Sequence, residues 1–149
     1  LGAGTGYFSA RLANMLPKAR IYAVDVEPDM VRFLGERAKR ENLRNLIAVA
    51  GAPDDPRLPE KVDVILLVDV YHHIPARTDY FAALRPALRP GGRLAIVDFR
   101  VDAPNGPPRS ARIAPDTVKQ ELARAGYALA AEHDFLPDQY FLVFAPAGR

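Results

Sequence analysis

Three glycines alternate at the beginning of the chain, in the segment LGAGTGYFSARLA, and an aspartate follows at Asp25. Gly2, Gly4 and Gly6 permit left-handed backbone and let a ligand lie against bare main chain where a helix begins. Asp25 follows Gly6 by roughly 20 positions, where a carboxylate can accept hydrogen bonds from a ribose diol. The combination predicts binding of a nucleotide-type ligand. The alternative interpretation is a tight turn followed by a solvated strand end.

Other residues with chemical potential follow later strand-like segments. The segment VDVILLVDVYHHI contains Asp69, His72 and His73, and LRPGGRLAIVDF ends close to Asp98. In an open parallel sheet, ligands bind beyond the carboxyl ends of the strands, so these residues belong to the expected site. A histidine has an ordinary pKa of about 6.5 and can accept a proton at neutral pH. His72 and His73 are therefore candidate bases, unless they only pack against or cap the next helix.

An alternation of helices and strands would position these residues. We predict helices after Gly6, from Pro28 onward, over residues 76–88, and between Pro115 and Gly126. Strands are predicted over residues 20–26, 45–50, 61–70, 93–99, 128–134 and 140–144. The pattern predicts one α/β domain over residues 1–149, with a Rossmann-like, doubly wound, mostly parallel sheet and an antiparallel C-terminal hairpin.

The composition excludes several classes of protein. The chain of 149 residues contains no cysteine, which excludes disulfides, thiolate metal sites and cysteine nucleophiles and favours a reducing, cytoplasmic location. Its net charge is only +2, with acids and bases intermixed, so we expect no nucleic-acid partner. No apolar run approaches the roughly 20 residues that a membrane span requires. The oligomeric state is left open.

Four segments resemble, in order, the motifs of the class I S-adenosylmethionine-dependent methyltransferases: LGAGTGYFSARLA, YAVDVEPDMV, VDVILLVDVYHHI and LRPGGRLAIVDF. The likeness is greatest to the small methyltransferase-domain group that includes the ubiquinone/menaquinone-biosynthesis type. It implies transfer of a methyl group from S-adenosyl-L-methionine to a small-molecule acceptor by direct in-line displacement. In that family a hydrophobic strand and an acid precede GxGxG, so we expect a chain cut within its first, central strand, which is largely missing.

The resemblance implies roles for residues of the first motifs. Asp25 would bind the ribose hydroxyls of the methyl donor, and Val26 would lie against its adenine ring. The glycine loop would contact the methionine moiety through Gly2, Ala3, Gly4, Thr5 and Gly6.

The remaining cofactor contacts are implied less directly. The backbone at Val68–Asp69 would bind the methionine amino group. Many relatives carry an acid after the third strand for the adenine amine, but Ala52 stands at that position here. Either backbone groups replace the acid, or Asp54 or Asp55 reaches back to the adenine.

Two further hypotheses concern the acceptor side. Asp69 and Asp98 resemble the magnesium-binding carboxylates of the catechol-type O-methyltransferases, but the additional Asp-Asn pairing is missing, so we expect no metal. The proline-rich loop 101–113 either is a surface connection or forms a lid that attracts an anionic substrate through Arg109 and Arg112. The D/N-P-P-Y pattern of methyltransferases that act on nucleic-acid bases is absent, so methylation of a base is not expected.

Two alternatives to a methyltransferase activity remain. A nicotinamide-dinucleotide domain would carry GxGxxG, but Tyr7 or Ser9 stands at the position of the third glycine. A non-catalytic, methyltransferase-like binding or partner subunit is the other alternative. A decayed domain tends to lose its glycines or its ribose-binding acid, and this chain has both.

Overall fold

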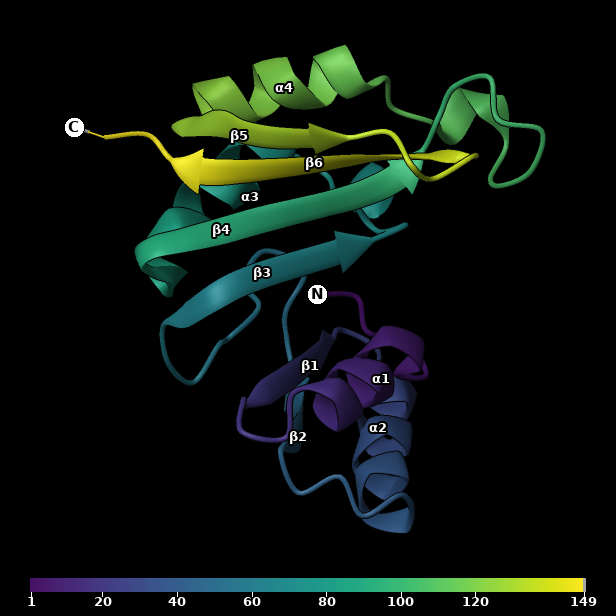
Figure 1. Ribbon diagram of the computed structural model, residues 1–149, viewed down its shortest axis with the longest axis vertical. Helices are drawn as coiled ribbons and strands as arrows, with labels where there is room; N and C mark the ends of the chain where they lie inside the picture. The colour runs from purple at the N-terminus through teal and green to yellow at the C-terminus, as the bar shows by residue number, and fades with distance from the viewer. Residues whose placement is uncertain (149) are drawn as a thin grey trace. The chain divides into compact units, whose positions relative to one another are not determined.

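The computed structural model describes residues 1–148, which form two compact units. Unit 1, Leu1–Pro59, contains helices α1 (Tyr7–Met15) and α2 (Pro28–Arg40) and strands β1 (Ile21–Asp25) and β2 (Leu46–Ala50). The two strands pair in parallel, with Ile21 opposite Leu46 and Asp25 opposite Ala50. Their carboxyl ends therefore meet at one edge of this small sheet (Figure 1).

The core of unit 1 follows from the apolar spacing of its helices. Leu34 of α2 is completely buried and shares a cluster with small and aliphatic side chains: Ala10, Ala13, Ala23, Leu43 and Leu46. Helix α1 enters this cluster through its alanines, whereas Tyr7 and Phe8 are 56% and 46% exposed. Small side chains let α1 approach the sheet closely, so the loop that precedes it lies against β1.

Unit 2 begins at Glu60 and contains a four-stranded sheet with the order β3-β4-β6-β5. Strands β3 and β4 are parallel, and β6 pairs antiparallel with both β4 and β5. The strands and helices are β3 (Val62–Val68), α3 (Arg77–Leu84), β4 (Leu88–Phe99), α4 (Pro115–Arg124), β5 (Tyr127–His133) and β6 (Gln139–Pro146). Short 3-10 turns cover Tyr71–His73, Arg85–Ala87 and Arg109–Ala111.

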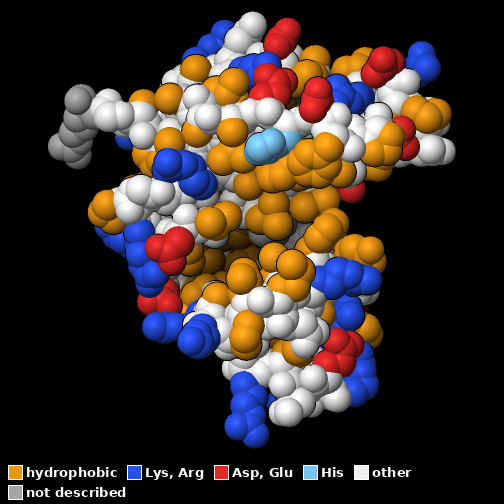
Figure 2. All heavy atoms as spheres, in the orientation of Figure 1, with side chains coloured by type: hydrophobic (Ala, Val, Ile, Leu, Met, Phe, Trp, Pro, Cys, Tyr) orange, Lys and Arg blue, Asp and Glu red, His pale blue; other side chains and the backbone are white. Residues whose placement is uncertain are grey.

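The two faces of the sheet in unit 2 differ. Figure 1 shows α3 behind the sheet and α4 beside β5, and the side chains of Phe81, Leu84, Val118 and Leu122 from these helices are buried. On the face toward the viewer, hydrophobic side chains gather over β5 and β6 (Figure 2). The ring of His133 in β5 contacts those of Phe135 and of Phe141 in β6, and Phe135 is 70% exposed.

The predicted fold class is confirmed: both units alternate helices with parallel strands, and an antiparallel hairpin closes the chain. One boundary differs clearly. Strand β4 begins at Leu88, five residues before the predicted strand 93–99, because Pro90, Gly91 and Gly92 lie in an irregular stretch of the strand. The predicted helix over 76–88 ends at Leu84 and continues only as a 3-10 turn.

The prediction of a single domain stays a prediction. In residues 1–148, no helix is long and apolar enough to cross a membrane.

Candidate functional site

The glycine loop of unit 1 has the backbone that the sequence predicts. Gly2, Gly4 and Gly6 have φ values of 65°, 54° and 82°, in the left-handed region that side chains disfavour. The amide of Ala3 donates a hydrogen bond of 2.9 Å to the carbonyl of Val24, and the Gly6 amide donates to the Ala3 carbonyl at 2.9 Å. The loop is therefore tied to the end of β1 and turns directly into α1.

Two glycines of this loop have different surroundings. A Cβ atom at Gly6 would lie 2.7 Å from Cδ2 of Leu34, so this glycine is required by the packing of α2. A Cβ atom at Gly4 would meet nothing within 4 Å. Gly4 therefore leaves open space above the loop, which a ligand can enter and a side chain would fill.

Asp25 holds this loop through backbone amides. Its side chain lies at the end of β1, and the residue is only 8% exposed. Oδ2 accepts a hydrogen bond from the Gly4 amide at 2.8 Å, and Oδ1 accepts one from the Glu27 amide at 3.0 Å. Each carboxylate oxygen has two lone pairs, so each retains one acceptor direction for a ligand hydroxyl. The sequence indicated Asp25 as a ligand acceptor but not its contact with the loop, which joins residues 21 positions apart.

The residues expected around the adenine lie near this edge of unit 1. Val26 directly follows β1 and is 50% exposed. After β2, the Ala52 amide donates to the Asp55 carbonyl at 2.6 Å, and the Asp55 amide donates back at 3.2 Å. Oδ1 of Asp55 accepts from the Arg57 amide at 2.8 Å, whereas Asp54 is exposed. The roles of Val26, Ala52 and Asp54 in cofactor binding stay predictions.

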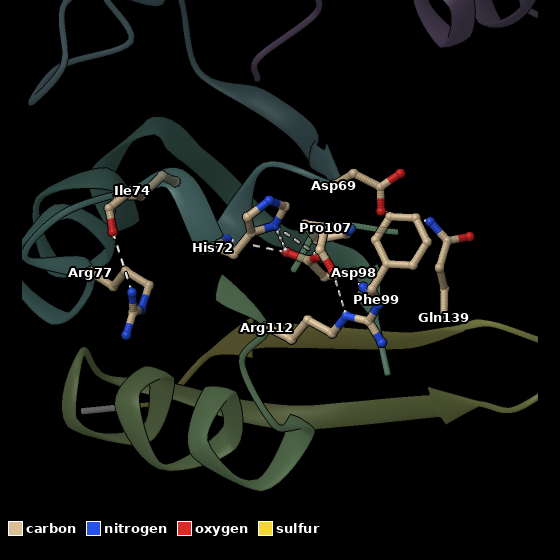
Figure 3. Close-up of polar contacts among 9 residues, drawn as sticks. All are labelled: Asp69, His72, Ile74, Arg77, Asp98, Phe99, Pro107, Arg112 and Gln139. Carbon is tan, nitrogen blue, oxygen red and sulfur yellow. Dashed lines mark hydrogen bonds and ion pairs between the residues drawn. The ribbon is translucent and has the colours of Figure 1, made fainter. Parts of the chain in front are cut away.

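A second buried carboxylate organises the polar residues of unit 2. Asp98, near the end of β4, is 2% exposed and lies beside the 3-10 turn that contains His72 (Figure 3). Nδ1 of His72 lies 3.0 Å from both carboxylate oxygens. The backbone amides of His72 and Phe99 also donate to Asp98, at 3.2 Å and 2.8 Å. The side chains of the pair are 4% and 3% exposed, so water competes little for these contacts.

This pairing decides what the His72 ring can do. Because an ionised carboxylate only accepts hydrogen bonds, Nδ1 opposite an ionised Asp98 carries a hydrogen and donates a hydrogen bond to it. In the neutral ring Nε2 then has a free lone pair, and no residue within 1–148 supplies a hydrogen bond to it. Asp98 also stabilises the charged ring that forms when Nε2 takes a proton. Asp98 and His72 thus have the arrangement of a general base with its orienting carboxylate.

His73 has a different environment from its neighbour. Its residue is exposed, and its ring lies against that of His72 with a centroid distance of 4.1 Å. No side-chain hydrogen bond to His73 occurs in the described part of the chain. The structure therefore distinguishes the two histidines that the sequence offered as candidate bases.

Asp69 ends β3 in a strained conformation, with a φ of 57° that non-glycine residues rarely adopt. Its amide donates to the Val97 carbonyl at 2.9 Å, and its Oδ1 accepts from Nε2 of Gln139 at 2.6 Å. Burial raises the pKa of the Asp69 carboxyl above its ordinary value, and the hydrogen bond from Gln139 opposes that shift. Gln139, the first residue of β6, was not anticipated because it becomes a neighbour only through the pairing of β6 with β4. Binding of the methionine amino group at Asp69 stays a prediction.

The carboxylates at this edge have protein partners. Asp98 contacts His72 and the Phe99 amide, and Asp69 contacts Gln139 (Figure 3). Within the part of the chain that the structure describes, no group of three or more His, Cys, Asp or Glu residues is placed to hold a metal ion.

The loop that follows β4 is organised by Arg112. The guanidinium donates to five backbone carbonyls, those of Arg100, Val101, Ala103, Asn105 and Pro107. These donors hold the loop together, and the role of Arg112 as a contact for an anionic substrate stays a prediction. Arg109 is exposed and stays untested as a substrate contact.

A partly buried ion pair fixes the turn that carries His72. Nε and Nη2 of Arg77 donate to the two carboxylate oxygens of Glu121 at 2.7 Å and 2.8 Å, and the Tyr71 hydroxyl donates to the same carboxylate at 2.6 Å. The hydrogen bond from Arg77 lowers the pKa of Glu121, and burial raises the pKa of Tyr71. Because Tyr71 is completely buried, the position of the adjacent His72 follows from the packing of α4.

The sequence of the chain matches a known protein family and several known enzymes. A family model described as "Methyltransferase domain" matches residues 1–94. An erythromycin 3''-O-methyltransferase from Saccharopolyspora erythraea is 37% identical over 100 residues, which are 62% of this chain and 33% of that protein. A malonyl-(acyl-carrier protein) O-methyltransferase from Methylococcus capsulatus is 35% identical over 100 residues, 66% of this chain and 36% of that protein. The chain thus spans about a third of the length of these relatives.

Solved structures share the fold. A SAM-dependent methyltransferase from Aquifex aeolicus superposes with a TM-score of 0.90 over 98% of this chain and 79% of its own, at 21% identity. A glycopeptide N-methyltransferase in complex with (S)-adenosyl-L-methionine gives a TM-score of 0.81 over 99% of this chain and 80% of its own, at 14% identity. At these identities the likeness establishes the Rossmann-like fold alone.

Proposed function

Because the chain belongs to the methyltransferase-domain family, we propose that it takes part in methyl transfer from S-adenosylmethionine to a small-molecule acceptor. One observation carries this proposal: the Asp25 carboxylate is held at the open glycine loop by the amides of Gly4 and Glu27. The names of the relatives support the same reaction class, since both matched relatives described above are O-methyltransferases.

The residues of unit 1 fit the methyl donor. Asp25 would accept hydrogen bonds from the two ribose hydroxyls with the lone pairs that its backbone partners leave free. The methionine portion would lie over Gly4, where a Cβ atom would meet nothing within 4 Å. The half-exposed Val26 would contact the adenine ring, and Ala52 and Asp54 lie in the loop that would flank it. When bound, S-adenosylmethionine supplies a methyl group on a positively charged sulfur.

The residues of unit 2 suit an acceptor that must lose a proton. Nε2 of His72 would accept the proton of an acceptor hydroxyl, while Nδ1 stays bonded to Asp98. The burial of both side chains keeps water from competing for the carboxylate. His72 is therefore the proposed base and Asp98 the residue that positions it. His73 carries no equivalent partner and is assigned no proton transfer.

The alternatives receive less support. A dehydrogenase would need a third glycine in the GxGxxG pattern, and Tyr7 and Ser9 occupy the two possible positions. A non-catalytic partner subunit has no need of a buried histidine paired with a carboxylate. The relatives and solved structures described above are all named as methyltransferases.

Two glycine variants of the intact protein that contains this chain test the proposal. Gly4→Val would fill the open space above the loop and should abolish binding of S-adenosylmethionine in a calorimetric titration. Because the φ of 54° also strains a valine at this position, the melting temperature of the variant is measured alongside. Gly6→Val is the matched control, because its Cβ would collide with Leu34 and lower the melting temperature first. Unchanged affinity in the Gly4→Val protein would refute the assignment of this loop.

A further inference from the structure

We propose that unit 2 contains a second binding site, for a phosphate group, at the end of the sheet opposite Asp69 and Asp98. A cavity of about 610 Å³ opens there, at the amino ends of β3 and β4. Figure 1 shows these two ends side by side, as their parallel pairing requires. The site is independent of the proposed methyl transfer, because no residue of the glycine loop or of the His72–Asp98 pair lines it.

The lining of the cavity is cationic. Four basic residues line it, and no aspartate or glutamate does: Lys61, Arg85, Arg89 and Arg93. Arg89 is already neutralised, since Nη1 contacts Asp63 at 2.8 Å and Nη2 contacts Glu60 at 3.2 Å. The other three have no carboxylate partner in residues 1–148. Three positive charges around one hollow attract an anion.

Arg85 is the strongest indication of a missing partner. Its Nε atom is buried and has no hydrogen-bond partner in the described chain. Buried polar groups normally have partners, because leaving a charged donor unsatisfied costs free energy. The guanidinium of Arg85 occupies the space that a side chain at position 126 would need. A Cβ atom at Gly126 would come within 3 Å of the guanidinium carbon and closer to Nη1. The glycine, with a φ of +84°, thus makes room for the side chain of Arg85, which is one of the residues that line the cavity.

The wall of the cavity is formed by the irregular start of β4. Val62 pairs with Leu88 and Val64 with Arg93, so the residues from Arg89 to Gly92 loop out opposite Asp63. Nη1 of Arg93 donates to the carbonyls of Gly91 and Gly92 at 2.7 Å and 3.0 Å, which holds the side chain at this wall. Its Nε and Nη2 atoms remain available to a ligand. A Cβ at Gly92 would lie 2.9 Å from the Arg89 carbonyl, so this backbone tolerates no side chain there.

The donor set favours a phosphate over a carboxylate. Two guanidinium groups and one ammonium supply donors from several directions, which suits a tetrahedral anion with multiple oxygens. A phosphate monoester carries nearly two negative charges at neutral pH and compensates more of the three unpaired cations than a carboxylate does. The group is either free inorganic phosphate or the phosphoryl end of a larger small molecule.

The test is a calorimetric titration of the intact protein with inorganic phosphate and, separately, with glycerol phosphate, at neutral pH and constant ionic strength. Removing one charged donor with Arg85→Met should raise the phosphate Kd at least about tenfold, and Lys61→Met should raise it roughly threefold or more. Arg44→Met removes the same charge from an exposed position in unit 1 and should leave Kd unchanged. Tighter binding of glycerol phosphate than of phosphate would identify a phosphorylated small molecule, and equal binding would identify the free anion.

Three results would overturn the proposal. One is a wild-type protein that binds neither phosphate compound. Another is an acetate or citrate affinity above that of phosphate. The third is an Arg44→Met protein that loses as much affinity as the cavity variants, which would indicate a non-specific charge effect. If Arg85→Met does not fold, the phosphate Kd of the Lys61→Met protein becomes the deciding measurement, because Lys61 is exposed. An unchanged Kd in this variant would contradict the site.

Discussion

Asp25 and Asp98 are two buried carboxylates near strand ends, and the structure uses them differently. Asp25 accepts hydrogen bonds from the backbone amides of Gly4 and Glu27. Asp98 accepts from the amides of His72 and Phe99 and also holds the imidazole of His72. Backbone amides do not titrate, whereas an imidazole does so near neutral pH. The first carboxylate therefore fits a binding role, and the second fits a role in proton transfer.

This comparison gives a rule for separating the two roles by experiment. Changes at Asp25 should alter the affinity for the methyl donor, because its free lone pairs point away from its backbone partners. Changes at Asp98 should alter the turnover rate and its pH dependence, because they change the His72 ring. A variant at Asp25 therefore serves as the control for the turnover rate, and a variant at Asp98 serves as the control for the affinity.

The largest effect is expected for Asp98→Asn in the intact protein. An asparagine oxygen can still accept from a backbone amide, but the pairing of Nδ1–H with a charged carboxylate is lost. We expect kcat to fall about 10²- to 10⁴-fold, the usual contribution of a general base. The Kd for S-adenosylmethionine should change less than about twofold, because Asp98 has no assigned contact with the donor. Initial rates and calorimetry measure the two quantities.

The variant His72→Gln sharpens this test. If Asp98 acts through His72, the double variant should be no slower than the slower of the two single variants, because the residues act as one unit. Losses that multiply in the double variant would show that the two residues act separately. An Asp98→Asn protein with nearly full activity would remove the pair from the reaction.

A smaller effect is expected for Asp25→Ala, measured as affinity. Hydrogen bonds to a charged acceptor contribute roughly 1.5–3 kcal/mol each, so the loss of two should weaken binding of S-adenosylmethionine at least about tenfold. Adenine, which lacks the ribose, should bind almost equally to both proteins. Asp29→Ala, at a side chain 79% exposed in the same unit, is the control and should be neutral. Equal losses for S-adenosylmethionine and adenine would instead indicate a folding defect.

The smallest effect is expected for His73→Ala. His73 is exposed and contacts the neighbouring ring without a side-chain hydrogen bond in the described structure. Methyl transfer should stay within about two- to threefold of wild type, typical of a surface substitution away from the chemistry. A loss as large as that of His72→Gln would mean that the base has been assigned to the wrong histidine.

The elements were predictable where local chemistry decides them. Helix α2 begins at Pro28 and α4 at Pro115, and Gly126 follows α4 with a φ of 84°, as the preferences of proline and glycine at helix ends require. The same preferences led to a wrong prediction for the start of β4, which begins at Leu88 and includes a proline and two glycines. Pro90 and Gly91 normally interrupt structure, but here they lie in an irregular stretch that pairing with β3 tolerates.

The site was predictable only in part. The glycine loop and Asp25 are separated by one helix and one strand, so their spacing already indicates a common ligand. The contact of His72 with Asp98 depends on the register that places Val68 opposite Val97, which no local pattern specifies. Gln139 reaches Asp69 only because β6 pairs with β4, after a connection whose length alone fixes no register.

The most direct test of the account is a calorimetric titration of the intact protein with S-adenosylmethionine, its demethylated product and NAD. The account predicts one-to-one binding of the first two ligands, weakened at least about tenfold by Asp25→Ala, and no binding of NAD. Binding of NAD, or a wild-type protein that ignores S-adenosylmethionine and its product, would contradict the proposed methyl transfer.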